Sequence, residues 1–400
     1  MSTRVVLEAS HAVAEAVRMA DVDVVAAYPI TPQTHIPERL AEMVAEGELD
    51  ASYVPVESEH SAMSCVLGSA AVGARSFTTT AGQGLELMHE ALYIASSHRY
   101  PIVMAVCNRT LSAPINIWCD HSDVMSCRDT SWIQVFCQNN QESFDMTLWA
   151  FRVAEDPAVM FPVMVNLDGF ILSHVTEPLI LPDQKEVERF LPSYRYRLAL
   201  NPDSPTSHGC FGLPDIYTEV KYSQEIALRE SKTVLDRGWK EFADIFGRQY
   251  RAVETYKAEG ASTLLVTMGS LGETAKMVID RKREQGERVG HLNLRLWRPF
   301  PFSEFREAVR NVETLVVLDR CFSFGGPGGP VASELRSALY DSEPRPKVVS
   351  FIGGIGGREV DAEAFTYMID HGNELAKKGS EYLYEPLIVR GLETGTGVRG

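Results

Sequence analysis

The sequence lacks the cysteine spacings that hold zinc ions or iron–sulfur clusters. None of its seven cysteines is separated from another by two residues, the spacing typical of such sites. The odd number, with several cysteines inside apolar runs, predicts reduced thiols and a cytoplasmic location. No signal peptide is expected at the N-terminus, because Glu8, His11, Glu15 and Arg18 interrupt the opening residues.

Long apolar runs and excess positive charge are also missing. The apolar run at 101–107 is far shorter than the ~20 residues that a membrane-spanning helix needs, so no membrane span is expected. The formal net charge of −16 argues against binding to nucleic acid or to anionic membranes. Neither a G-x-S-x-G elbow nor a Walker A motif is present, and Gly82-Gln83-Gly84 is too short to predict a phosphate loop.

The composition is that of an ordinary globular protein, with 400 residues of which 45% are hydrophobic. A repeated strand–turn–helix rhythm predicts an α/β domain over residues 1–200. Closely spaced prolines and glycines at 202–214 and a charged, helix-prone region at 219–259 predict a connector over 201–259, with a loop and long helices. The rhythm then restarts, which predicts a second, smaller α/β domain over 260–400.

Glycine-rich turns mark the second domain at 325–329 and 353–357. They allow close approach of the backbone to a neighbouring group. They do not fit G-x-G-x-x-G after the domain's first strand, so no dinucleotide site is predicted. The last residues, 393–400, are expected to be loosely ordered.

Three loops of the first domain carry its candidate functional residues. The α/β rhythm implies a doubly wound, mostly parallel sheet, and active residues in such sheets lie at the carboxyl ends of the strands. That rule selects the loops at 28–34, 57–60 and 108–123.

Glu59 lies where a short strand gives way to a helix rich in small residues, within the stretch 54–65. The first turn of a helix favours a negative charge because of the helix dipole. By itself, this position fits an ordinary acidic first turn as well as a catalytic carboxylate.

Arg109 and Thr31 each admit two interpretations. Arg109 follows a buried-type strand and could clamp a substrate carboxylate by two parallel hydrogen bonds, or form an ion pair with Asp120 or Asp123. Thr31 precedes Pro32 in a loop and could hydrogen-bond a small substrate or cap the next helix.

The segment Asp120-His121-Ser122-Asp123 contains the residue types of a metal or acid–base cluster. No second histidine cluster at ligand spacing accompanies it, so a hydrogen-bonded loop is the favoured interpretation.

Taken together, several of these segments resemble the α subunit of the 2-oxoacid:acceptor oxidoreductase family, and most closely that of pyruvate:ferredoxin oxidoreductase (pyruvate synthase). The motifs occur in the same order, and the resemblance runs from Tyr28 to Gly354. The matching segments are Tyr28–Pro32, Val56–Ala62, Gln83–Glu90, Asn108–Trp118 and Asp120–Asp123.

This resemblance implies a thiamine-diphosphate pyrimidine-type doubly wound domain followed by a transketolase C-terminal-like α/β domain. Thiamine diphosphate would lie between this subunit and a β subunit. Glu59 would hydrogen-bond N1′ of the aminopyrimidine and promote the imino tautomer, which removes the proton from thiazolium C2. Pro29 would line the cofactor, Thr31 and Arg109 would contact the 2-oxoacid, and Glu57 would have no special role.

The implied reaction is the oxidative decarboxylation of a 2-oxoacid, with coenzyme A taking the acyl group and carbon dioxide leaving. Electrons would pass through 4Fe–4S clusters to ferredoxin or to a flavin/NAD module. The chain has no G-D-G…N-N segment for a magnesium-held diphosphate, and Leu167-Asp168-Gly169-Phe170 is only superficially similar. We therefore expect Mg²⁺ on the β subunit, and the clusters on γ and iron–sulfur subunits.

Pyruvate is the favoured substrate, because Thr31 suits a small 2-oxoacid. The alternatives are a branched-chain or aryl 2-oxoacid of the phenylglyoxylate type. Cys119 and Cys127, in the loop after Arg109, depart from the commoner family pattern. A non-oxidative thiamine-dependent decarboxylase subunit and a non-catalytic scaffold are the competing functions.

Overall fold

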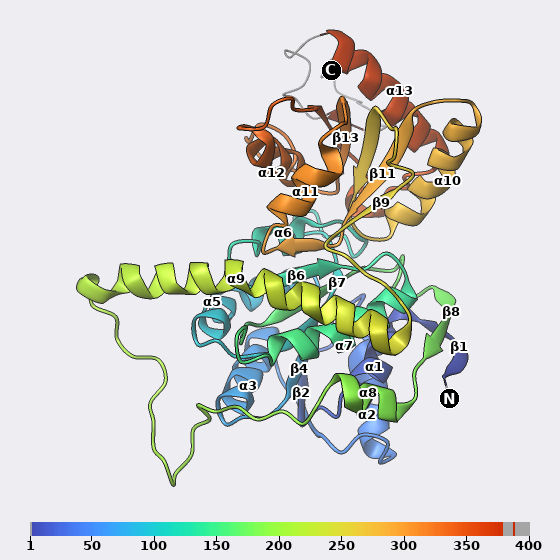
Figure 1. Ribbon diagram of the computed structural model, residues 1–400. Coiled ribbons are helices and arrows are strands. Elements are labelled where there is room, and N and C mark those ends of the chain that lie inside the picture. The colour runs from blue at the N-terminus through green and yellow to red at the C-terminus, as the bar shows by residue number, and fades with distance from the viewer. Residues whose placement is uncertain (1, 379–386, 389–400) are drawn as a thin grey trace. The chain divides into compact units, whose positions relative to one another are not determined.

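The computed structural model describes residues 2–378 and 387–388, so the expectation for residues 393–400 lies outside the described residues. The chain forms two compact units. The first contains residues 1–254 and 294–301, and the second contains 255–293 and 302–400 (Figure 1).

A seven-stranded sheet forms the centre of the first unit, in the order β12-β6-β7-β5-β4-β2-β3. The neighbouring strands pair in parallel, except that β12 is antiparallel to β6. The central strands β5 and β7 are mostly apolar and wholly buried, as expected where helices cover both faces. The strands are β2 (Val24–Ala27), β3 (Ser52–Pro55), β4 (Ser76–Thr80), β5 (Val103–Asn108), β6 (Ile133–Phe136), β7 (Val163–Asp168) and β12 (Leu296–Arg298).

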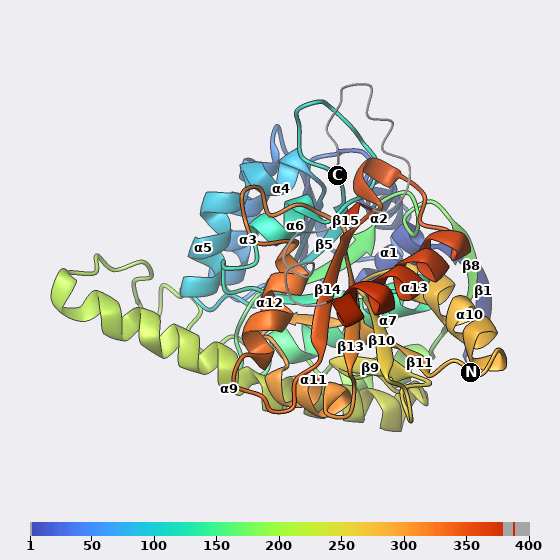
Figure 2. The same ribbon diagram turned by 90° about the horizontal axis from the view of Figure 1, so that it is seen from above.

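Two groups of helices flank this sheet. α1 packs against α2 and α7, whereas α3 packs against α4 and α5 (Figure 2). The chain passes from β2 to β3 in one direction and from β3 to β4 in the other, so right-handed crossovers place α2 and α3 on opposite faces. The helices are α1 (Ala9–Met19), α2 (His35–Ala45), α3 (Glu59–Ala71), α4 (Gln83–Leu87), α5 (His89–Ser97), α6 (Ser122–Ser126) and α7 (Asn140–Ala154).

The connector contains one long helix, α9 (Pro214–Phe246). It packs on α7 through Trp239, whose ring stacks on that of Trp149 at 4.7 Å between centroids. Helix was expected up to residue 259, but α9 ends at Gly247, which adopts the left-handed conformation that terminates helices. The chain then becomes extended and forms β9 (Val253–Tyr256).

A separate two-stranded pairing precedes the connector. β1 (Thr3–Glu8) pairs with β8 (Thr176–Leu181), and α8 (Gln184–Phe190) follows β8 in the chain.

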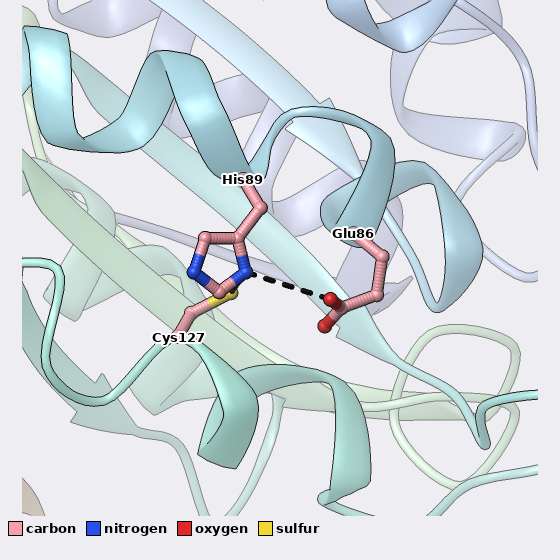
Figure 3. Close-up of side chains that lie close together, drawn as sticks. All are labelled: Glu86, His89 and Cys127. Atoms are coloured by element: carbon pink, nitrogen blue, oxygen red, sulfur yellow. Dashed lines mark hydrogen bonds and ion pairs between the residues drawn. The ribbon is translucent and has the colours of Figure 1, made fainter.

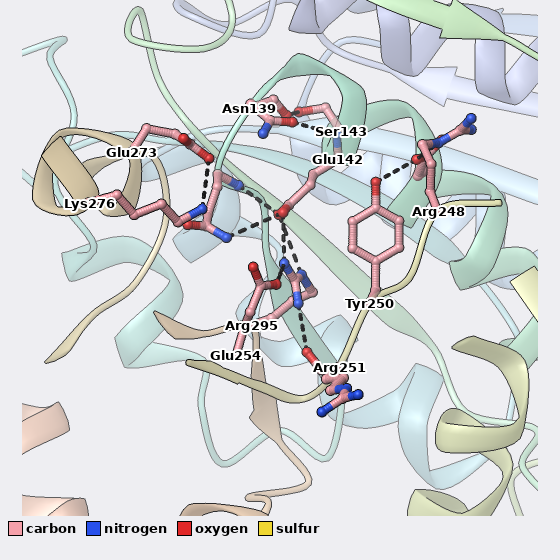
Figure 4. A network of polar contacts seen from close by, with 12 residues as sticks. Asn139, Glu142, Ser143, Arg248, Tyr250, Arg251, Glu254, Glu273, Lys276 and Arg295 are labelled. Atoms are coloured by element: carbon pink, nitrogen blue, oxygen red, sulfur yellow. Dashed lines mark hydrogen bonds and ion pairs between the residues drawn. The ribbon is translucent and has the colours of Figure 1, made fainter. Parts of the chain in front are cut away.

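Arg295 lies where the chain re-enters the first unit, and it is fully buried. Its Nη2 is 2.7 Å from Glu142 Oε1 and 2.5 Å from Glu254 Oε2 (Figure 4). Its Nη1 donates to the carbonyl of Arg251 at 2.7 Å. Breaking a buried ion pair leaves an uncompensated charge, so this network anchors the chain to the first unit at the first two of its three crossings between the units.

The second unit is built on a six-stranded sheet in the order β15-β14-β13-β10-β11-β9. β10, β11, β13, β14 and β15 pair in parallel, so the α/β architecture expected for both halves of the chain is confirmed. The strands after β9 are β10 (Thr263–Thr267), β11 (Val289–Leu294), β13 (Thr314–Asp319), β14 (Lys347–Ile352) and β15 (Leu387–Ile388). The helices are α10 (Leu271–Glu284), α11 (Phe302–Val309), α12 (Pro330–Leu339) and α13 (Ala362–Lys378).

The glycine-rich turn at 325–329 brings the backbone against a buried carboxylate. A Cβ atom on Gly329 would lie only 2.1 Å from Cγ of Asp319. Asp319 accepts hydrogen bonds from the N–H groups of Val331 and Ala332, at 2.7 and 3.1 Å, in the first turn of α12. Among the helices in the described part of the chain, none combines the length and the apolar character that crossing a membrane requires.

Candidate active site

The candidate residues gather at the carboxyl ends of β2, β3, β4 and β5. β2 lies between β3 and β4, so the strand order reverses beside it. Ligands of open parallel sheets bind in the crevice at such a switch point. The loops at 28–34, 57–60, 81–84 and 108–123 therefore share one edge of the first sheet.

A buried glutamine shapes the loop that carries Pro29 and Thr31. Gln33 Nε2 donates to the carbonyls of Tyr28 and Thr79, at 3.2 and 2.9 Å, and its Oε1 accepts from the N–H of Ile30 at 3.3 Å. These bonds fasten the loop to the end of β4. Sequence reasoning missed Gln33, because nothing in its local pattern distinguishes it from a solvent-facing glutamine.

Pro29 and Thr31 themselves are exposed at this edge. The alternative role of Thr31 as a helix cap is wrong. α2 begins at His35, and the cap position belongs to Thr34. Thr31 instead uses its carbonyl oxygen to accept a hydrogen bond from Arg109 Nη1 at 3.0 Å.

Arg109 is only 7% exposed, and its guanidinium also donates from Nε to the carbonyl of Asn116 at 3.2 Å. The proposed ion pair of its side chain with Asp120 or Asp123 is wrong. Among the described residues the guanidinium has no carboxylate partner, and Asp123 accepts the backbone N–H of Arg109 instead, at 2.9 Å. Burial lowers the pKa of Arg109, and the carboxylates of Asp123 and Glu59 partly oppose that shift. Nη2 remains without an acceptor in the described chain.

Asp123 is completely buried and connects two of the loops. Its carboxylate accepts the backbone N–H groups of Gly82, Arg109 and Val124, at 3.0, 2.9 and 2.7 Å. Burial is the main reason that its pKa rises to about 7, with the charge of Asp120 adding to the shift. The 120–123 segment is hydrogen-bonded, since Asp120 Oδ1 also accepts from the hydroxyl of Ser122 at 2.6 Å, but Ser122 and Asp123 belong to α6 and not to a loop.

Glu59 opens α3 and is 6% exposed. Ser58 caps the helix by accepting the N–H of Ser61 at 3.2 Å, which fixes where the first turn begins. Gly84 makes room for the carboxylate, because a Cβ atom at position 84 would lie 2.6 Å from Glu59 Oε1. No residue in the described ranges donates a hydrogen bond to the Glu59 carboxylate or forms an ion pair with it.

Glu57 differs from Glu59 although the two are separated by a single residue. Its side chain is exposed and accepts a hydrogen bond from the Ser61 hydroxyl at 2.7 Å. That hydrogen bond is the main cause of its lowered pKa. Glu57 is thus a solvated, satisfied carboxylate, whereas Glu59 is buried and has no partner in the part of the chain that the structure describes.

Further unsatisfied polar atoms belong to Thr80, which shares the space beside Gly84 with Glu59, and to Gln83, which directly precedes Gly84. The Thr80 hydroxyl and both side-chain polar atoms of Gln83 are buried and have no hydrogen-bond partner in the described part of the protein. Each buried unsatisfied group costs about 1–3 kcal/mol, so such a cluster fits a site that a polar ligand completes. A planar heterocycle with ring nitrogens and an amino group, such as the aminopyrimidine of thiamine diphosphate, matches these donors and acceptors.

Asp168, at the end of β7, is engaged with its own neighbours. His121 Nε2 lies 2.9 Å and Cys119 Sγ 3.6 Å from its Oδ1, and all three side chains are buried. Gly169 lets Pro32 pack closely, because a Cβ at 169 would meet Pro32 Cγ at 2.6 Å. The Leu167–Phe170 segment thus connects loops within this chain.

Comparison with known proteins identifies the family to which this chain belongs. Residues 15–237 match the family described as pyruvate flavodoxin/ferredoxin oxidoreductase, thiamine diphosphate-binding. Residues 261–365 match the pyruvate:ferredoxin oxidoreductase core domain II. The parallel sheet with its switch-point site is therefore a thiamine-diphosphate-binding domain. The chain belongs to the pyruvate:ferredoxin oxidoreductase family.

Relatives of similar length support this assignment. The chain is 46% identical to the pyruvate synthase subunit PorA of Pyrococcus furiosus, with 94% of each chain covered. It is 48% identical to PorA of Thermotoga maritima, over 90% of this chain and 92% of that one. It is also 43% identical to the ketoisovalerate oxidoreductase subunit VorA of Pyrococcus horikoshii, over 88% and 90%.

Solved structures share the fold at low sequence identity. A 2-oxoglutarate:ferredoxin oxidoreductase from Magnetococcus marinus, with 2-oxoglutarate, coenzyme A and succinyl-CoA bound, matches with a TM-score of 0.69 and 18% identity. The match covers 93% of this chain and 65% of that one. A split-gene transketolase matches with a TM-score of 0.56 and 12% identity, over 92% of this chain and 99% of the other.

Proposed function

We propose that the chain is the α subunit of a cytoplasmic, multi-subunit, thiamine-diphosphate-dependent 2-oxoacid oxidoreductase whose substrate is pyruvate. The complex converts pyruvate and coenzyme A to acetyl-CoA and carbon dioxide and passes electrons to ferredoxin or to a flavin/NAD module. The pyruvate synthase subunits among the relatives support the choice of substrate.

The observation that carries the proposal is the buried carboxylate of Glu59, which has no partner among the described residues, together with the unsatisfied polar atoms of Thr80 and Gln83. Thiamine diphosphate, when bound, supplies the nucleophilic carbon that attacks the 2-oxo group. Glu59 would hold N1′ of the pyrimidine ring by a hydrogen bond and would favour proton transfer at that ring. A carboxylate shielded from water is suited to this task, because no solvent competes for its oxygen atoms.

Arg109 and Thr31 form the substrate side of the proposed site. The guanidinium uses Nε and Nη1 for backbone carbonyls, and Nη2, which has no acceptor among the described residues, can donate to the substrate carboxylate. Thr31 is exposed and accepts from Arg109 Nη1 through its carbonyl, and in this proposal its side chain contacts the small 2-oxoacid. Pro29, in the same loop, lines the cofactor.

Partner chains complete the enzyme in this proposal. A β subunit supplies the diphosphate-binding half with Mg²⁺, and γ and iron–sulfur subunits carry the 4Fe–4S clusters. Two observations support this division. Asp168 is already engaged by His121 and Cys119, and the sequence has no cysteine spacing that would bind an iron–sulfur cluster.

A branched-chain 2-oxoacid is the second candidate substrate, since the VorA relative is nearly as similar as the PorA relatives. The test is to supply the whole complex with pyruvate, 2-oxoisovalerate and phenylglyoxylate, and to measure reduced acceptor and acyl-CoA together. We expect pyruvate to give the highest kcat/KM, with one acyl-CoA formed for every two electrons transferred.

Aldehyde release without acceptor reduction would instead assign a non-oxidative decarboxylase. The isolated chain provides the second arm of the test. We expect no thiamine-dependent 2-oxoacid oxidation from the isolated chain, and substantial activity from it would contradict the shared site.

A further inference from the structure

Glu86, His89 and Cys127 bring their side chains together outside the proposed active site (Figure 3). Glu86 lies in α4, His89 begins α5, and Cys127 directly follows α6. One ligand atom from each residue lies within 4.8 Å of the other two. Glu86 and His89 are half-buried and Cys127 is fully buried.

The distances match the edges of a small coordination tetrahedron. His89 Nδ1 is 3.5 Å from Glu86 Oε2 and 3.9 Å from Cys127 Sγ. Zinc bond lengths of about 2.0–2.3 Å at tetrahedral angles separate nitrogen from oxygen by about 3.4 Å and nitrogen from sulfur by about 3.6 Å. The two distances to His89 Nδ1 therefore lie within a few tenths of an ångström of those in a zinc site, and the Glu86 oxygen and the Cys127 sulfur lie within 4.8 Å of each other.

The same three residue types could also form a nucleophilic triad, but the geometry excludes it. In a triad the two nitrogens of the imidazole ring have different partners, one the nucleophile and the other the carboxylate. Here the sulfur and the carboxylate both approach Nδ1 of His89. Burial also raises the pKa of the Cys127 thiol, which opposes formation of a free thiolate. Convergence on one point is what a cation between the three atoms requires.

Both segments hold their ligands in place. Glu86 and His89 are three residues apart on consecutive helical segments and so face the same side. The Cys127 carbonyl accepts from Thr130 Oγ1 at 2.8 Å and from Gln134 Nε2 at 3.1 Å. These bonds fix the backbone that presents the sulfur.

We propose that Glu86, His89 and Cys127 bind one zinc-type divalent cation, with water as the fourth ligand. A thiolate, an imidazole and a carboxylate form a set that suits zinc, whereas magnesium and calcium prefer oxygen ligands alone. Binding exchanges the thiol proton of Cys127 for the cation and releases that proton to solvent.

The ion would link α4 and α5 to α6, which contains Asp123. Asp123 in turn holds the N–H groups of Gly82 and Arg109 at the sheet edge. The cation thus stabilises the loops of the proposed active site without touching substrate or cofactor. The proposed ion holds these loops in position, and its binding can be measured without assaying the enzyme's reaction.

The experiment uses the full chain, stripped of metal and then titrated with Zn²⁺ or Co²⁺. We expect one zinc ion per chain, a rise in Tm on zinc addition, and a thiolate-to-cobalt charge-transfer band with Co²⁺. Cys127→Ser and His89→Gln should lose the zinc ion, the band and the rise in Tm. Cys210→Ser is the matched control, because Cys210 is an exposed cysteine that should not contribute.

Circular dichroism of each metal-free variant establishes that it is folded. A wild-type chain that takes up no zinc would overturn the proposal. So would a cobalt band that persists in Cys127→Ser or disappears in Cys119→Ser, since the latter would move the site to the cluster around Asp168.

Discussion

Glu59 in the first unit and Asp319 in the second occupy comparable places. Each is a buried carboxylate near the junction of a parallel strand and a helix, and each is crowded by a glycine, Gly84 or Gly329. Asp319 accepts two backbone N–H groups, whereas Glu59 has no partner among the described residues. Burial of a carboxylate therefore does not mark a site by itself. The unsatisfied carboxylate identifies the candidate site, and the satisfied one has a structural role.

The largest effect is expected from Glu59→Gln. A neutral amide cannot promote the proton transfer assigned to the carboxylate, so kcat of the reconstituted complex should fall by about 10²–10⁴-fold. The 2-oxoacid-dependent reduction of acceptor measures this loss, and Tm should change little. Glu57→Gln is the matched control and should keep the wild-type rate. Equal rates for the two variants would remove the distinction between Glu59 and the structural carboxylates.

Arg109→Lys should act on substrate binding. A lysine cannot donate to the Thr31 and Asn116 carbonyls and to a carboxylate in the same fixed geometry. Loss of one charged hydrogen bond predicts a rise in KM for pyruvate of about 10–100-fold. Initial rates of the complex at varied pyruvate concentration measure it. Arg310→Lys, in an exposed ion pair with Glu307, is the control, and an unchanged KM for Arg109→Lys would place Arg109 outside the substrate site.

Gly84→Ala tests the close approach of α4 to Glu59. The added methyl group would lie 2.6 Å from Glu59 Oε1 and 2.5 Å from Thr80 Oγ1, so the carboxylate must move. Misplacing a catalytic group by about 1 Å predicts a loss of roughly tenfold or more in kcat. Gly68→Ala, in α3 with open space around its Cβ position, should keep its activity and serves as the control. Wild-type kinetics for Gly84→Ala would show that the space beside Glu59 is not needed.

Asp319→Asn should change stability and leave substrate kinetics unaffected. At pH 5 the buried carboxyl is protonated and its hydroxyl oxygen can still accept, whereas the amide places an NH₂ group against one of the two backbone N–H groups, which predicts a loss of about 1–2 kcal/mol in the free energy of unfolding. Burial is the main reason that the folded pKa of Asp319 rises from 3.8 to about 7. Its contribution to stability is therefore greatest below pH 3.8 and declines as the pH rises through 7.

The difference in free energy of unfolding between the wild type and Asp319→Asn should therefore shrink between pH 5 and pH 8. The wild type loses stability as Asp319 ionises, whereas the variant has no ionisable group at this position. Urea unfolding at several pH values measures the trend, with the exposed Asp341→Asn as the control. A deficit that widens with pH would mean that the charged form of Asp319 is stabilised, and the comparison with Glu59 would then fail.

Much of the local structure follows from the sequence. The apolar runs at 101–107 and 161–166 overlap most of β5 and β7, and a helix does begin at Glu59, with Ser58 as its cap. The loops that contain the candidate residues could be chosen from the strand-end rule alone. The end of α9 could not, because Gly247 terminates the helix inside a region whose charge pattern still favours helix.

Sequence by itself determined the fold class and the family, because periodicity, turn residues and short motifs express local backbone preferences. Only the tertiary structure decided the partners of the candidate residues. Gln33 bonds to Thr79, 46 residues away, and Arg109 to Thr31, 78 residues away. Such pairs exist because β4 lies between β2 and β5 in the sheet. Which strands become neighbours depends on burying apolar surface across the whole unit, and no local pattern encodes that.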